Sequence, residues 1–356
     1  MFFVNNSSFK FTDFKKKFLN SRRKFINNSF QSFLGLSLSN LIIENKLFAK
    51  EFTSQKKIEI SLQCFSFASE LLYGKRSILD FPNLVRNEFE LDAAEYWNIP
   101  FANKIRDNNF VKEINLRTDD NGLKNTLMLV DLIDITTGSS ISLCSKDKKE
   151  RSIAIEKHKE WLDFSKSIGC SSIRVNLWSD NLSMDQVSKF SIDSLNHLLE
   201  YSEKIDMSIV IENHGGYTAD AFWLVKLIKS INHERLGVLP DFGSNNFCIE
   251  KPPKKEEELF NTNKCINQFD KYIGVKKLLP FARGISAKSV SFDKNGNEEN
   301  TDFERMINLI RSSSFKGYIA IEYEGGFINT LAKNSSKNLS NVAGVHATKK
   351  LIEKFI

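Results

Sequence analysis

Ile209-Val210-Ile211-Glu212-Asn213-His214-Gly215-Gly216 is a short apolar, β-branched run that ends abruptly in a carboxylate, an amide, an imidazole and two glycines. This pattern predicts a buried strand that delivers polar side chains to an edge where chemistry can take place. Because side chains alternate along a strand, we expect Glu212 and His214 on the same side. The alternative interpretation is a strand followed by a polar turn, in which His214 caps a neighbouring group.

The residues around this stretch repeat one unit from Lys57 onward, a short apolar segment followed by a longer amphipathic one. Strands are expected at 58–62, 91–96, 126–131, 172–176, 209–216, 236–241, 284–289 and 317–324, with helices between them. Eight such units predict a single (β/α)8 TIM barrel over residues 55–356. An open doubly wound sheet is the alternative, but no Gly-x-Gly-x-x-Gly turn follows the first strand. Two long loops, 247–272 and 325–343, would lie at the barrel mouth, the first as a solvated excursion.

The formal net charge of +6 is concentrated at the N-terminus. Residues 1–50 carry nine lysines and arginines against two acidic residues, so the rest of the chain has a net charge near zero. A near-neutral body has no electrostatic footprint for nucleic acid, and we expect no nucleic-acid partner. No apolar stretch reaches the length of a membrane span.

The N-terminal segment 1–50 has the layout of an export signal, a basic patch followed by a mildly apolar stretch. The run Ser21-Arg22-Arg23-Lys24-Phe25-Ile26 resembles a twin-arginine translocation signal, which implies export to the periplasm. The alternative is a disordered basic tail on a cytoplasmic protein. The five cysteines form no CxxC pair and are odd in number, so the sequence suggests neither a structural zinc site nor a complete disulfide framework.

Function in a TIM barrel collects where the strands end, so the residues at the predicted strand ends are the candidate site. They are Glu95, Arg174, Asn176, Glu212, Asn213, His214, Asp241, Lys288, Glu322 and Glu324. Buried carboxylates are costly unless a cation meets them, so their convergence predicts a divalent metal or the basic partners Arg174 and Lys288. In the alternative interpretation Glu95 pairs with Arg174 as barrel packing, and Asp241 caps the turn that follows it.

Four motifs in order resemble the sugar phosphate isomerase/epimerase family of xylose isomerase-like TIM barrels. They are Glu212-Asn213-His214-Gly215-Gly216, Leu239-Pro240-Asp241-Phe242-Gly243, Ser286-Ala287-Lys288-Ser289 with Phe292-Asp293-x-x-Gly296-Asn297, and Gly317-Tyr318-x-x-Ile321-Glu322-Tyr323-Glu324-Gly325. The resemblance extends from about Ile58 to the C-terminus and includes Ser172-Ile173-Arg174-Val175-Asn176.

The resemblance implies a divalent metal, Mn²⁺, Mg²⁺, Co²⁺ or Zn²⁺, held by Glu212, Asp241 and Glu322. The family's histidine ligand falls on Ser286, so a hydroxyl replaces an imidazole and Lys288 adds a positive charge nearby. Such a site would favour a harder ion, bind it more weakly, or use Lys288 in its place.

By the same resemblance, Glu212 and Glu322 are the expected catalytic acid and base, and the substrate is a small sugar or polyol. The candidates for binding it are His214, Arg174, Lys288, Glu95, Asn176 and Glu324. The resemblance thus predicts a metal-assisted isomerase or epimerase. The alternatives are a degenerate barrel that binds sugar without turnover and, last, an endonuclease IV-like enzyme, whose zinc site needs more histidines than the strand ends supply.

Overall fold

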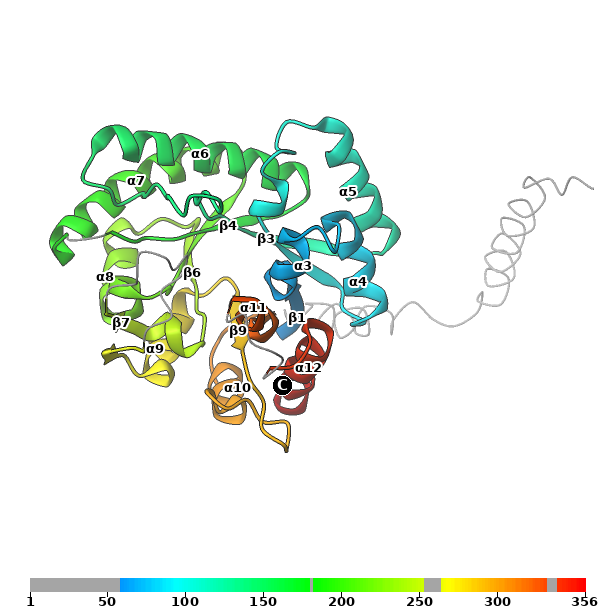
Figure 1. The fold of residues 1–356 in the computed structure, drawn as a ribbon. Coiled ribbons are helices and arrows are strands. Elements are labelled where there is room, and N and C mark those ends of the chain that lie inside the picture. Colours follow the sequence, from blue (N-terminus) through cyan, green and yellow to red (C-terminus); the bar gives the residue numbers. More distant parts are fainter. Residues whose placement is uncertain (1–57, 180–181, 253–263, 332–337) are drawn as a thin grey trace, which may run out of the picture. The chain divides into compact units, whose positions relative to one another are not determined.

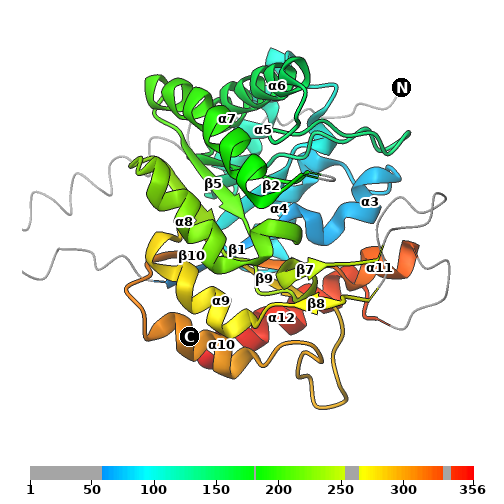
Figure 2. The ribbon, with the colours of Figure 1, turned by 90° about the vertical axis from the view of Figure 1, so that its left-hand side faces the viewer.

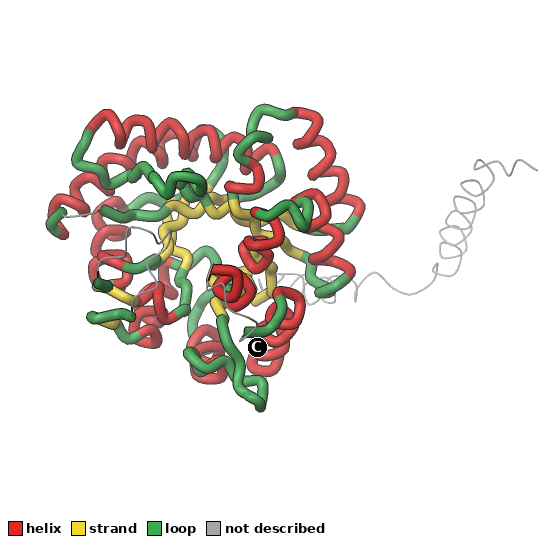
Figure 3. The backbone as a smooth tube through the Cα atoms, viewed as in Figure 1, coloured by secondary structure: helices red, strands yellow, loops and turns green. Residues whose placement is uncertain are grey.

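The computed structural model describes residues 58–179, 182–252, 264–331 and 338–356, and the expected leader over residues 1–50 lies outside them. An eight-stranded parallel sheet curls into a ring with helices outside it (Figures 1 and 3). Its strands are β1 (Ile58–Gln63), β2 (Ala93–Trp97), β3 (Lys124–Leu129), β4 (Ser172–Val175), β5 (Ser208–Glu212), β6 (Leu236–Leu239), β9 (Ile285–Ser289) and β10 (Gly317–Tyr323). The predicted TIM barrel is confirmed.

The strand order β6-β5-β4-β3-β2-β1-β10-β9 follows the chain, as expected when each strand is joined to the next by a helical crossover. The helices are α3 (Ala68–Leu72), α4 (Phe81–Asn87), α5 (Asn108–Asp120), α6 (Lys148–Ser167), α7 (Met184–Lys204), α8 (Ala221–Ile231), α9 (Lys271–Leu278), α10 (Phe303–Arg311), α11 (Gly325–Leu331) and α12 (Asn341–Phe355). Of the described helices, none is long and apolar enough to cross a membrane. The last helix begins at Asn341, where the Ser340 side chain caps it by accepting from the Ala343 amide.

The ring closes between β6 and β9 through isolated bridges rather than a continuous ladder. Val238 pairs with Ala282, and Asp241 pairs with Ser286. The Ser286 amide donates to the Pro240 carbonyl over 2.9 Å. This seam therefore brings together two of the residues predicted to hold a metal.

Strand alternation divides the polar and apolar residues of the barrel. Along β5 the side chains of Ile209 and Ile211 are fully buried in the hydrophobic core, whereas Glu212 points to the other side. On β9, Ser286 and Lys288 are two residues apart, so their side chains lie on the same side of the strand. After β5 the chain turns at Gly215 and Gly216, whose φ angles of 82° and 56° explain the double glycine of the motif.

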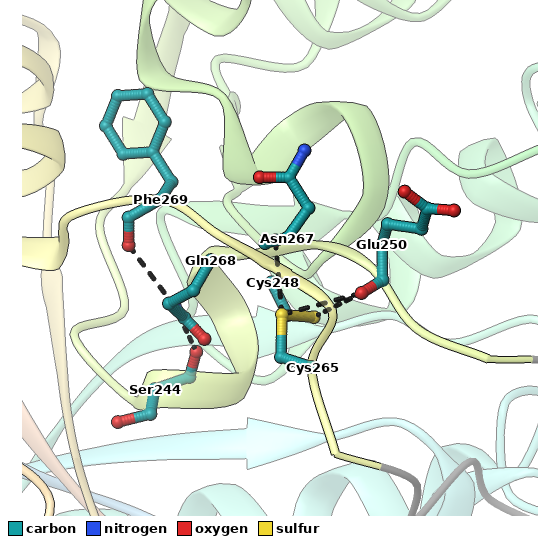
Figure 4. The surroundings of a disulfide bond; sticks show 7 residues. All are labelled: Ser244, Cys248, Glu250, Cys265, Asn267, Gln268 and Phe269. Carbon is teal, nitrogen blue, oxygen red and sulfur yellow. Dashed lines mark hydrogen bonds between the residues drawn. A yellow bond between two sulfur atoms is a disulfide. The ribbon is translucent and has the colours of Figure 1, made fainter.

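The long loop after β6 contains an antiparallel hairpin whose second strand is exposed, and residues 253–263 of the predicted solvated excursion lie outside the described residues. Strand β7 (Cys248–Glu250) pairs with β8 (Asn267–Gln268), on the side of the barrel where α11 also lies (Figure 2). A disulfide joins Cys248 to Cys265 beside the hairpin (Figure 4). Gln268 ties the hairpin to the preceding turn by donating to the Ser244 carbonyl over 3.0 Å.

The sequence suggested no complete disulfide framework, and the described residues contain this one disulfide. The hairpin brings together two residues 17 positions apart, which a count of cysteines cannot reveal. The remaining cysteines, Cys64, Cys144 and Cys170, are buried and form no disulfide.

Candidate active site

Three carboxylates meet at the carboxyl ends of the strands. Glu212 ends β5, Asp241 follows β6, and Glu322 lies near the end of β10. One oxygen from each lies within 4.8 Å of the other two, and all three side chains are buried. The structure therefore gathers into one cluster the three acidic residues that the sequence placed on separate strands.

Lys288 lies against this cluster. Its ammonium nitrogen is 3.0 Å from Asp241 Oδ2, 3.4 Å from Glu322 Oε1 and 2.9 Å from Glu324 Oε1. Lys288 and Glu322 are register partners on the adjacent strands β9 and β10, which fixes their proximity. Although burial opposes its charge, these carboxylates raise the pKa of Lys288 well above its usual value.

Arg174 forms the second basic contact of the site. Its Nε lies 2.9 Å from Glu212 Oε2, and its Nη1 lies 2.5 Å from Asp131 Oδ1. Burial acts against the charge of Asp131, but the Arg174 guanidinium lowers the pKa of that carboxyl to about 2. Asn176 donates to the same Asp131 oxygen over 2.8 Å, and Trp97 donates to the other over 2.8 Å.

The turn after β6 supports the carboxylates from one side. The Gly243 amide donates to Asp241 Oδ1 over 2.7 Å, so Asp241 also caps this turn, as the alternative interpretation held. Asn246 donates from Nδ2 to Glu212 Oε1 over 3.0 Å. Asn213 bonds the Asp241 backbone in both directions, at 2.8 and 2.9 Å. The turn that holds Asn246 leads directly into the disulfide-linked hairpin.

Burial brings the pKa values of three carboxyl groups close to neutral pH. It raises the pKa of Glu212 to about 7, against the opposing effect of Arg174, and that of Asp241 to about 7, against Lys288. Burial also raises the pKa of Glu322 to about 8, again against Lys288. Groups with such pKa values can exchange protons at neutral pH, and a bound cation would lower these pKa values.

Glu95 belongs to a separate polar layer. It accepts from Ser61 Oγ over 2.8 Å and from Gln63 Nε2 over 3.1 Å, and not from Arg174, with which the alternative interpretation had paired it. The register explains this difference, because Glu95 is level with Leu127 and Ser172, two residues before Arg174 on β4. Burial raises the pKa of Glu95 to about 7.

The remaining candidates lie nearer the solvent. His214 follows the end of β5 with an exposed side chain, and its backbone amide donates to Thr218 Oγ1 over 2.8 Å. Glu324 is partly exposed and holds the outer side of the Lys288 ammonium. The predicted substrate-binding roles of His214, Glu324, Arg174, Lys288, Glu95 and Asn176 stay predictions.

The sequence matches the family model of the xylose isomerase-like TIM barrels over residues 87–341. The chain belongs to this family. No match is found among the curated proteins.

Solved structures of the same fold include several sugar epimerases. A 3-keto-D-glucoside 4-epimerase from E. coli shares 15% identity, with 83% of this chain and 99% of that chain covered and a TM-score of 0.58. A D-psicose 3-epimerase from Clostridium cellulolyticum, solved with D-tagatose, shares 10% identity over 84% and 99% of the chains, with a TM-score of 0.60. The IOLI protein, solved with a bound zinc atom, shares 11% identity over 84% and 99%, with a TM-score of 0.58. At these identities the likeness shows the fold.

The donor set of this family member suits a hard divalent ion. It consists of oxygen atoms, from the three carboxylates and from the Ser286 hydroxyl, which donates to Glu322 Oε2 over 2.5 Å. Asp241 Oδ2 is buried and accepts no hydrogen bond from the described residues, and its charge faces the Lys288 ammonium. The residues therefore fit a cation, in competition with the positive charge already beside them.

Two residues of the site were missing from the sequence-based candidates. Asp131 closes the predicted third strand, so the strand-end argument could have found it. Asn246 lies in the turn between β6 and the hairpin, and no pattern in the sequence indicates that it reaches Glu212.

Proposed function

We propose that this chain is an isomerase or epimerase that moves a proton at a carbon next to the carbonyl of a sugar. The proposal rests mainly on the meeting of Glu212 and Glu322, from β5 and β10, in one buried cluster with oxygens within 4.8 Å. Burial raises the pKa of these carboxyls to about 7 and about 8. A carboxyl group in that range can both remove and return a proton at neutral pH.

The two carboxyls have different supports, which suits them to opposite roles. Glu212 is fixed by Arg174 and Asn246, so its orientation is determined by the protein. Glu322 is held by the Ser286 hydroxyl at 2.5 Å and faces Lys288 at 3.4 Å. In the proposed reaction one of the two groups, as a carboxylate, removes the proton from carbon, and the other, as the protonated carboxylic acid, returns a proton to the carbanion. Lys288 supplies positive charge where negative charge develops on the substrate oxygen.

Glu212, Asp241 and Glu322 would hold a divalent ion, with the Ser286 hydroxyl at the fourth position. When bound, the ion supplies positive charge that stabilises the oxygen of an enediolate. An all-oxygen donor set favours Mn²⁺ or Mg²⁺ over Zn²⁺.

The charge at the strand ends favours an uncharged sugar over a sugar phosphate. Five carboxylates surround two cations there, namely Asp131, Glu212, Asp241, Glu322 and Glu324 around Arg174 and Lys288. The net charge of these ionised groups stays negative even after a divalent ion binds, so they would repel an added phosphate. We therefore propose a neutral ketose as the substrate class.

The test is deuterium exchange from D₂O into a panel of neutral ketoses and their phosphates, with Mn²⁺ or Mg²⁺ added. Deuterium is expected at the carbon next to the carbonyl of a neutral sugar. Glu212→Gln and Glu322→Gln are each expected to slow the exchange by at least about 100-fold. Glu299→Gln, at an exposed position outside the cluster, is the matched control. Absence of exchange across the whole panel, or exchange of full speed in both site variants, would refute the proposal.

A sugar-binding protein without turnover is the second candidate, and the position of Lys288 favours it. Its ammonium can neutralise Asp241 and Glu322 without a metal. In that case calorimetry would show sugar binding that survives both chelator and Glu212→Gln, with no deuterium exchange.

We also propose that the protein is exported. The basic leader with Arg22 and Arg23 supports this, and so does the Cys248–Cys265 disulfide, since such bonds persist in oxidising compartments. Fractionation of cells expressing the full chain tests the idea. The wild type is expected in the periplasm, and Arg22→Lys/Arg23→Lys in the cytoplasm. Equal distributions of the two proteins would contradict it.

A further inference from the structure

The feature that separates this site from an ordinary carboxylate metal centre is the lysine inside it. Lys288 Nζ contacts Asp241 and Glu322, two of the three carboxylates that would hold the ion, at 3.0 and 3.4 Å. Its side chain is 6% exposed, so solvent screens these interactions little. A divalent ion bound by the same oxygens would therefore meet a positive charge at close range.

The structure provides a seat for this lysine. Its aliphatic stem crosses Gly243, where an added Cβ would lie 2.6 Å from Lys288 Cδ and 3.0 Å from Cγ. Gly243 also donates its amide hydrogen to Asp241 Oδ1. The absence of a side chain at Gly243 thus lets Lys288 reach the carboxylates. The packing of the Lys288 stem against Gly243 fixes the position of the ammonium.

Glu324 offers the lysine a second partner outside the cluster. It lies one residue beyond β10 and contacts Lys288 Nζ at 2.9 Å. Glu324 is also more exposed than Glu322, with side-chain exposures of 19% and 7%. The ammonium could therefore give up Asp241 and Glu322 while keeping one carboxylate, and it would not be left as an unpaired buried charge.

We propose that Lys288 is a displaceable internal counter-ion that competes with a divalent ion for Asp241 and Glu322. Glu324 is the ion-pair partner that Lys288 keeps when the ion displaces it. Without metal, Lys288 compensates the buried carboxylates and keeps them together. When a divalent ion binds, Lys288 shifts toward Glu324. The lysine thus sets the metal affinity of the site, and this inference rests on the metal site of the proposed function.

The experiment is calorimetric titration of Mn²⁺ into chelator-treated full-length protein at one fixed pH. Lys288→Met removes the competing charge and is expected to tighten Mn²⁺ binding at least about tenfold, equal to about 1.4 kcal/mol. Glu324→Gln removes the alternative partner of the Lys288 ammonium and is expected to weaken Mn²⁺ binding by several fold. In the Lys288→Met background, Glu324→Gln should have little further effect, because no ammonium remains to be moved.

The controls separate local from general effects. Lys294→Met removes the same charge from an exposed loop position and should leave the Mn²⁺ affinity unchanged. Lys288→Gln keeps a donor in the seat and replaces Lys288→Met if circular dichroism shows that the latter does not fold. If the wild type binds no measurable Mn²⁺, the appearance of binding in the Lys288 variant supports the inference.

The inference is overturned if neither Lys288 variant binds Mn²⁺ more tightly than the wild type. It is equally overturned if Glu324→Gln weakens binding to the same extent with and without Lys288. Both outcomes are distinct from a failure of the proposed function, which is read from deuterium exchange. If Glu212→Gln abolishes Mn²⁺ binding, the proposed metal site is supported even where competition by Lys288 is refuted.

Discussion

Replacing Glu95 with glutamine is expected to remove a large pH dependence from the stability of the barrel. Glu95 is 2% exposed, and burial raises its pKa from 4.5 to about 7 against the hydrogen bonds from Ser61 and Gln63. The folded protein therefore keeps the proton up to about pH 7, whereas the unfolded chain releases it near pH 4.5. The contribution of Glu95 to stability is fully present below pH 4.5 and is lost as the pH rises through about 7.

This pKa difference sets the size of the effect. A rise from 4.5 to about 7 corresponds to a loss of about 3 kcal/mol from the unfolding free energy across that pH window. Urea unfolding of chelator-treated protein between pH 5 and pH 8 measures it. Relative to the wild type, Glu95→Gln should lose about 3 kcal/mol less over this range, while exposed Glu299→Gln should follow the wild type. Parallel curves for the wild type and Glu95→Gln would refute the assignment of a raised pKa to this buried carboxyl.

Three further changes follow from described contacts, each measured by urea unfolding. Arg174→Met leaves two carboxylates of the site without their cation and should cost about 3–5 kcal/mol at pH 8, and a loss below about 1 kcal/mol would contradict the ion-pair geometry. Replacing both Cys248 and Cys265 with serine opens a link between residues 17 apart and should cost about 3 kcal/mol, with reductant destabilising the wild type but not this variant. Gly344→Ala drives a methyl group into the Tyr323 ring and should cost about 1–3 kcal/mol, so an unchanged midpoint would show that α12 can shift.

The fold was predictable because each barrel strand carries its own apolar signal. Strand β5 announces itself in Ile209–Ile211, and the capping box of Ser183 and Gln186 marks the start of α7. The convergence of Glu212, Asp241 and Glu322 could also be predicted, since parallel strands in a barrel end at one face.

The partners of these residues could not be predicted, because they depend on register and on loop conformation. The stagger of β2 against β3 and β4 places Glu95 below Arg174, so the guanidinium meets Asp131 and Glu212 instead. Asn246 reaches Glu212 through a turn that continues into a cross-linked hairpin, and short-range patterns in the sequence do not encode that path.

The seam of the barrel couples recognition to the integrity of the fold. Asp241 and Ser286, from opposite sides of the join between β6 and β9, pair through one of its isolated bridges, and both contribute to the proposed ion site. An ion bound by residues from both edges would link them. Its binding energy would therefore oppose local opening of the barrel at this join. Amide hydrogen exchange at Ser286 and Phe242, whose amides cross the join, should therefore slow as the ion is added.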